Sequence, residues 1–142
     1  MKIQPIHHGE YRSGRKNDCV VRALSNCTFL SYSVCEDVVG CFGRGLNEGT
    51  SPKALVKSCL YLGLSGPTMY GKTKRTEHFE RYVRPSLQEQ GMTLKTFLRL
   101  NPKGRFFVVY CGHALAVIDG QIIDTIDSNG NNRIIISFQD FR

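Results

Sequence analysis

The chain has 142 residues, of which 41% are hydrophobic and 22% are charged, and its formal net charge is +7. This size and composition are typical of a single globular domain, and no apolar run approaches the roughly 20 residues that a membrane-spanning helix needs. We therefore treat residues 1–142 as one domain with no membrane partner. A cytoplasmic location is expected, because residues 1–8 lack the apolar stretch of a signal peptide.

The first expected helix runs from about Cys19 to Thr28. Apolar residues recur there at helical spacing and give the helix one buried face: Val20, Val21, Leu24 and Cys27. Asp18 is the expected N-cap, with its carboxylate accepting hydrogen bonds from the free amides of the first turn. Cys19 would then lie where the helix dipole and the free N–H groups favour a thiolate.

Two further helices are expected before residue 64. Ser33 and Glu36 form a capping-box pattern, which predicts that the second helix starts there. Ser51 and Pro52 open the third helix, and Gly63 ends it.

Residues 64–91 show the weakest pattern in the chain and contain its densest basic run, residues 72–84. Acidic residues interrupt this run, and it matches no nucleic-acid-binding motif. We interpret it as a solvated loop or as the wall of a substrate groove. A last short helix is expected to begin at Met92 to Leu94 and to end before Pro102.

After Pro102 the apolar period changes from 3.6 to two, which predicts four strands: Arg105 to Tyr110, His113 to Ile118, Gln121 to Ile126 and Arg133 to Phe138. Asp119-Gly120 is a strong two-residue hairpin turn, and residues 128–131 form another turn. The expected fold class is α+β, with the helices of residues 1–100 packed on an antiparallel sheet of about four strands formed by residues 101–142.

The hairpin geometry selects an acidic partner for His113. A two-residue loop at 119–120 places Leu115 opposite Asp124, so that His113 and Asp124 share one face of the sheet. Asp127 falls on the other face unless a bulge shifts the register. A carboxylate at Asp124 could orient the imidazole of His113, as the third member of a catalytic triad does.

The six cysteines contain no CxxC pair, so neither a zinc ribbon nor a thioredoxin motif is present. We expect no metal, no cofactor and no disulfide framework, and most of the thiols are expected to be buried as small apolar groups. Cys19 could itself be such a buried residue. Cys111 is a rival nucleophile, but it lies in a strand and has no helix dipole to lower its pKa.

Two segments together are similar to the papain-like cysteine peptidases, especially the small bacterial and phage branches, NlpC-like proteins among them. The segments are Asn17 to Leu24, which opens the first helix with Cys19, and Gly112 to Thr125, which contains His113 and Asp124. The resemblance implies a papain-like fold and a cysteine-dependent peptidase, isopeptidase or amidase. In that chemistry Cys19 attacks, His113 is the base and acid, Asp124 orients His113, and a thioester forms.

The same resemblance implies a peptide or protein substrate, and the host cytoplasm as location if the protein is phage-encoded. One position departs from the family, which often has an oxyanion-hole glutamine six residues before the cysteine. Ser13 occupies that position here. Asn17 and Gln4 are the other candidate donors.

The sequence is also compatible with two alternative functions. An acyl transferase would pass the thioester's acyl group to an amine instead of water. A non-catalytic binding module of phage or bacterial origin would use the basic surface, with nucleic acid as a less favoured partner than peptide.

Overall fold

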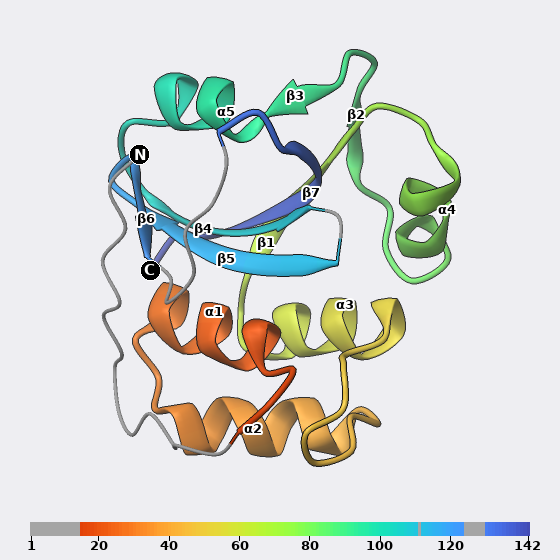
Figure 1. The fold of residues 1–142 in the computed structure, drawn as a ribbon, viewed down its shortest axis with the longest axis vertical. Coiled ribbons are helices and arrows are strands. Elements are labelled where there is room, and N and C mark those ends of the chain that lie inside the picture. Colours follow the sequence, from red (N-terminus) through yellow and green to blue (C-terminus); the bar gives the residue numbers. More distant parts are fainter. Residues whose placement is uncertain (1–14, 111, 124–129) are drawn as a thin grey trace.

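The computed structural model of the protein describes residues 15–110, 112–123 and 130–142, and within them it has five helices and seven strands (Figure 1). The helices are α1 (Cys19–Thr28), α2 (Tyr32–Cys41), α3 (Pro52–Tyr61), α4 (Lys74–Glu80) and α5 (Leu94–Leu100). The strands are β1 (Ser65–Tyr70), β2 (Ser86–Gln88), β3 (Met92–Thr93), β4 (Arg105–Tyr110), β5 (His113–Ile118), β6 (Gln121–Ile123) and β7 (Arg133–Asp140).

The strands form one sheet in the order β2-β1-β7-β4-β5-β6, with β3 paired to β7. β1 and β2 are parallel, and the other described pairs are antiparallel. The α+β class is therefore confirmed, whereas the expected antiparallel sheet of about four strands is wrong. The additional strands come from residues 65–93, where Gly66 and Pro67 interrupt β1 and all three residues of β2 are exposed. Alternating burial, the usual signal of a strand, is absent there.

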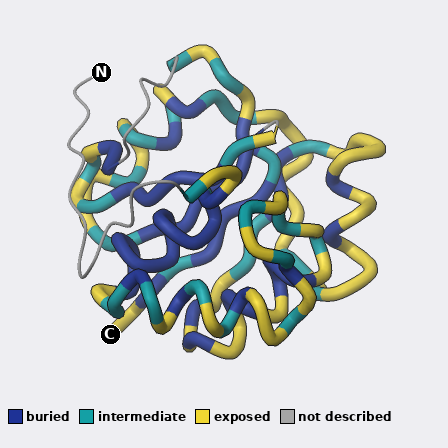
Figure 2. The backbone as a smooth tube through the Cα atoms, turned by 60° about the horizontal axis from the view of Figure 1, so that its bottom comes forward, coloured by how far each residue is buried: buried dark blue, intermediate teal, exposed yellow. Residues whose placement is uncertain are grey.

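Helices cover both faces of the sheet. In Figure 1, α1 and α3 lie against one face with α2 beyond them, and α5 lies on the opposite face. β4 shows the consequence, because Phe107 and Val109 pack with the first three helices while Phe106, Val108 and Tyr110 pack with α5. Burial on both faces explains why this strand is a continuous apolar run. Figure 2 shows the same distribution, with buried backbone concentrated in the centre and exposed residues along the outer segments.

The starts of the helices confirm most of the sequence pattern. α1 has the expected bounds, and α3 begins at Pro52 with the Ser51 hydroxyl accepting a hydrogen bond from the Ala54 N–H. The prediction that Ser33 caps α2 is wrong. Ser31 is the N-cap, and its hydroxyl accepts from the Val34 N–H, which leaves Ser33 inside the first turn.

The 119–120 turn forms as expected. Asp119 and Gly120 have φ angles of 49° and 77°, the left-handed values that such a hairpin turn requires. The register across it pairs Ile118 with Gln121 and Ala116 with Ile123, which agrees with the predicted pairing as far as Ile123.

Among the described helices, none is long and apolar enough to cross a membrane.

Candidate active site

Cys19 is the first residue of α1, the most buried helix of the protein. Every residue from Val20 to Thr28 is buried, whereas Cys19 is only partly buried and faces a cavity. α1 lies beneath β5 and begins below the end of the sheet where that strand starts (Figure 1). The packing of the apolar face of α1 thus fixes the thiol near His113, the first residue of β5.

The imidazole of His113 and the backbone N–H of Ala114 lie beside the Cys19 thiol and favour its thiolate form through hydrogen bonding. Burial by itself would raise the pKa of Cys19, but these two hydrogen bonds, with the charges of His113 and Arg22, lower it below its ordinary value of 9.0.

Three other cysteines behave in the opposite way. Burial raises the pKa of Cys27 and Cys35 to about 12, and it also raises the pKa of Cys59. Cys19 therefore differs from these structural thiols in its hydrogen-bonding neighbours and not in burial alone.

His113 is held at the start of β5 by its neighbour across the ladder. Tyr110 of β4 pairs with His113, and the two ring centroids are 5.4 Å apart in an edge-to-face arrangement. Gly112 precedes His113 with φ 71°, and among the described residues other than its chain neighbours none has an atom within 4 Å of the position that a Cβ at Gly112 would take.

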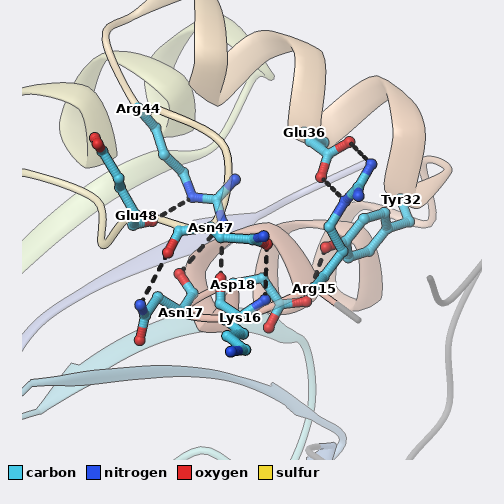
Figure 3. A network of polar contacts seen from close by, with 9 residues as sticks. All are labelled: Arg15, Lys16, Asn17, Asp18, Tyr32, Glu36, Arg44, Asn47 and Glu48. Atoms are coloured by element: carbon cyan, nitrogen blue, oxygen red, sulfur yellow. Dashed lines mark hydrogen bonds and ion pairs between the residues drawn. The ribbon is translucent and has the colours of Figure 1, made fainter. Parts of the chain in front are cut away.

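A polar network fixes the chain just before Cys19 (Figure 3). The buried guanidinium of Arg44 donates to the carbonyl oxygens of Glu48, Lys16 and Asn17, at 2.8, 3.2 and 3.4 Å. The Asn17 side-chain amide donates to the Asn47 carbonyl, and the Asn47 side chain accepts from the Lys16 N–H. Asn17 has φ 54°, a left-handed conformation that asparagine tolerates better than most residues. The loop that follows α2 and contains residues 44–48 therefore holds the turn that places Cys19 at the start of α1.

Asp18 is the N-cap residue of α1, as the sequence predicts, but its carboxylate does not form the predicted hydrogen bonds with the helix amides. The carboxylate instead accepts from the Tyr32 hydroxyl at 2.8 Å and pairs with Arg22 at 3.4 Å. Burial and the hydrogen bond to Asp18 raise the pKa of Tyr32. The acid thus ties α1 to α2, because a buried carboxylate is better compensated by an arginine and a hydroxyl than by helix amides alone.

The cavity beside Cys19 has a volume of about 330 Å³. Cys19, His113, Ala114 and Asn17 lie together on one side of its lining. Its apolar wall comes from five elements, α1, α3, α4, β4 and β7, and consists of Val20, Leu55, Phe79, Val109 and Ile135. At its rim α4 contributes Arg75 and His78, both exposed. A cavity with one activated thiol and a mainly apolar lining is the usual form of a small catalytic cleft.

The sequence predicted two members of this site, and both come together. Cys19 and His113 are in contact, and Asn17, one of the three candidate oxyanion donors, lines the cavity. Asp124, Asp127 and Cys111 lie outside the described residues, as do Gln4 and Ser13. The roles of these five residues stay predictions. The Cys19 backbone amide is a further candidate donor, because the first N–H groups of a helix have no acceptor within it.

The sequence does not single out Ile135, Arg75 or His78 as residues of the site. Arg75 and His78 belong to the basic run of residues 72–84, for which the sequence predicts a solvated loop or a groove wall. Part of this run is the helix α4, and its residues Arg75 and His78 line the cavity. No pattern in the sequence marks Ile135. Among the described residues, no group of three or more His, Cys, Asp or Glu side chains could hold a metal ion.

No family model, curated protein or solved structure matches this chain, so its function has to be argued from the site itself.

Proposed function

We propose that the protein is a papain-like cysteine hydrolase that cleaves a peptide, isopeptide or related amide bond through Cys19 and His113. The observation that supports this most is the hydrogen-bonded thiol at the start of α1, whose pKa is lowered inside an open cavity while other buried thiols have raised pKa values. A thiolate is the reactive form of cysteine, and a half-buried thiolate needs specific neighbours to exist.

The reaction follows from those neighbours. His113 takes the proton of Cys19, and the thiolate sulfur attacks the carbonyl carbon of the substrate. The carbonyl oxygen becomes an oxyanion, which the Cys19 backbone N–H and the Asn17 amide could stabilise. His113 returns the proton to the leaving amine as the C–N bond breaks. Water then attacks the thioester with His113 as base, which releases the carboxylic acid and the free thiol. Asp124 is proposed to orient the imidazole.

Selective alkylation tests the nucleophile before any substrate is known. The native protein is treated with iodoacetamide between pH 6 and 9, and the labelling rate of each cysteine is followed by peptide mass spectrometry. Exposed Cys41 is the internal reference. We expect Cys19 to react faster than Cys41 at pH 6.5, because a lowered pKa leaves more of it as thiolate there.

His113→Ala is the matched variant, and it should remove the advantage of Cys19 while leaving the labelling of Cys41 unchanged. If Cys19 of the native protein reacts no faster than Cys41 at pH 6.5, the proposed nucleophile is wrong. Cys19→Ala should also abolish cleavage of any peptide that the native protein cleaves. Product masses then separate hydrolysis from acyl transfer to an added amine.

A further inference from the structure

A second cavity lies next to the one beside Cys19. It has a volume of about 590 Å³ and lies between α4, the end of β1 and the start of β7. Arg75 and Ile135 line both cavities, so the two are adjacent and have a common wall. We call the two cavities together the basic groove.

A β-bulge creates the shared wall. β4 pairs Val109 with Ile136 but Tyr110 with Ile134, which leaves Ile135 as an extra residue in β7. Ile134 packs on the α5 face of the sheet, whereas Ile135 and Ile136 both pack on the face of the first three helices. Bulges re-aim side chains in this way, often beside active sites. Ile135 is thereby placed where the two cavities meet.

The second cavity is spacious because glycines line it. Gly71 and Gly91 face each other, and a Cβ at Gly71 would lie 3.8 Å from the backbone of Gly91. A Cβ at Gly91 would lie 2.8 Å from the guanidinium of Arg133, so any larger residue at Gly91 would displace that side chain. The absence of a side chain at Gly91 thus gives the Arg133 guanidinium its place in the wall of the second cavity.

The charge of the groove has one sign. Lys74, Arg75 and Arg133 line it, and among the described residues no Asp or Glu does. α4 also carries Glu77 and Glu80, but neither lines either cavity.

We propose that the basic groove binds an extended peptide segment with acidic side chains, and so makes the protein selective for acidic sequences on one side of the scissile bond. This inference rests on the proposed hydrolase function. The groove lies between the thiol, which attacks an acyl carbon, and three cationic side chains, and the rest of its lining is mainly apolar with a few uncharged polar side chains. Nucleic-acid binding is dominated by many phosphate contacts, which a groove with three cations and an apolar lining does not match.

Binding to the full-length Cys19→Ala protein tests the groove without requiring catalysis. Three fluorescein-labelled peptides of equal length are compared by anisotropy: one with alternating Glu residues, one with Gln in their place and one with Lys. We expect the Glu peptide to bind at least about tenfold more tightly than the Gln peptide, with an affinity that falls as salt rises.

Charge reversal identifies the residues. Arg75→Glu and Arg133→Glu should each weaken binding of the Glu peptide by about tenfold, because each places a like charge against the ligand. Lys103→Glu is the control with the same change in net charge, since Lys103 is exposed in the loop before β4 and lines neither cavity. Gly91→Leu displaces the Arg133 guanidinium from its place in the second cavity without changing the net charge, and it should weaken binding of the same peptide.

The binding and alkylation results together decide between the groove and the hydrolase function. Equal affinity for the Glu and Gln peptides, equal effects of Arg75→Glu and Lys103→Glu, or unchanged affinity in Gly91→Leu would overturn the proposal. Tighter binding of an oligonucleotide than of the Glu peptide, lost in the same variants, would also overturn it. Acid-selective binding together with a Cys19 that alkylates slowly in the native protein would support the groove and reject the hydrolase. Fast alkylation of Cys19 without acid-selective binding would support the hydrolase and reject the groove.

Discussion

Arg44 is expected to stabilise both the fold and the position of the nucleophile. Only 7% of its surface is exposed, and its guanidinium donates to three carbonyl oxygens, two of them immediately before Asp18. Hydrogen bonds of a charged group contribute about 1.5–3 kcal/mol each, and the bonds at 3.2 and 3.4 Å lie at the weak end of that range. Arg44→Met keeps the apolar stem of the side chain and removes all three. We expect a loss of about 3 kcal/mol in the free energy of unfolding, because some of the freed carbonyls regain water.

Urea denaturation followed by circular dichroism measures this loss. Arg84→Met is the matched control, because Arg84 is exposed and its substitution should change the free energy of unfolding by less than about 0.5 kcal/mol. Arg44→Lys separates charge from geometry, since an ammonium lacks the planar fork that reaches several carbonyls. It should recover only part of the loss.

The alkylation rate of Cys19 supplies a second measurement on the same variant. Without Arg44, the turn at Asn17 loses its main support, so the advantage of Cys19 over Cys41 at pH 6.5 should shrink under conditions where the protein is still folded. If the free energy of unfolding of Arg44→Met lies within about 0.5 kcal/mol of the native value, this network does not hold the turn.

Two further predictions concern buried polar groups. Tyr32→Phe removes the hydroxyl that donates to the buried carboxylate at the start of α1, and should cost about 1.5–3 kcal/mol in urea denaturation, whereas Tyr61→Phe, which alters an exposed ring, should cost almost nothing. Burial would raise the pKa of Asp140, but the hydrogen bonds from Arg142 and nearby positive charge lower it below its ordinary 3.8. Its stabilisation is therefore present above pH 3.8 and disappears as the pH falls through the lowered pKa. Asp140→Asn should accordingly be less stable than the native protein at pH 7, with the difference shrinking in acid, whereas Asp37→Asn, which alters an exposed side chain, should change the free energy of unfolding at pH 7 by less than about 0.5 kcal/mol.

The parts of the site that the sequence predicted depend on short-range patterns. The apolar spacing after Cys19 identifies α1 and its first turn from ten residues. The Asp119-Gly120 turn fixes the register of β5 and β6 as far as Ile123, because a two-residue hairpin allows only one pairing. His113 could therefore be assigned to the start of a strand and proposed as the partner of Cys19.

The parts that the sequence missed depend on contacts between distant segments. Arg44 lies 28 residues from Lys16, whose carbonyl it binds, and nothing in the local pattern distinguishes it from a surface arginine. Asp18 has a typical N-cap identity, yet it is bonded to Tyr32, 14 residues away. Local propensity cannot reveal such a partner, because the same carboxylate could satisfy helix amides equally well.

The position of Ile135 explains why the sequence did not predict the shape of the groove, although it predicted the strand correctly. In Ile134-Ile135-Ile136 all three residues are apolar, so the sequence is equally compatible with regular alternation and with a bulge. Regular alternation would direct Ile135 to the face opposite Ile134 and Ile136, but the shift in register between β4 and β7 instead separates Ile134 from Ile135 and Ile136. Both faces of the sheet are covered by helices and accept an isoleucine, so hydrophobicity does not decide between the two arrangements. The pairing of β7 with β4 decides it, and that pairing places an apolar side chain in the wall that the two cavities of the basic groove have in common.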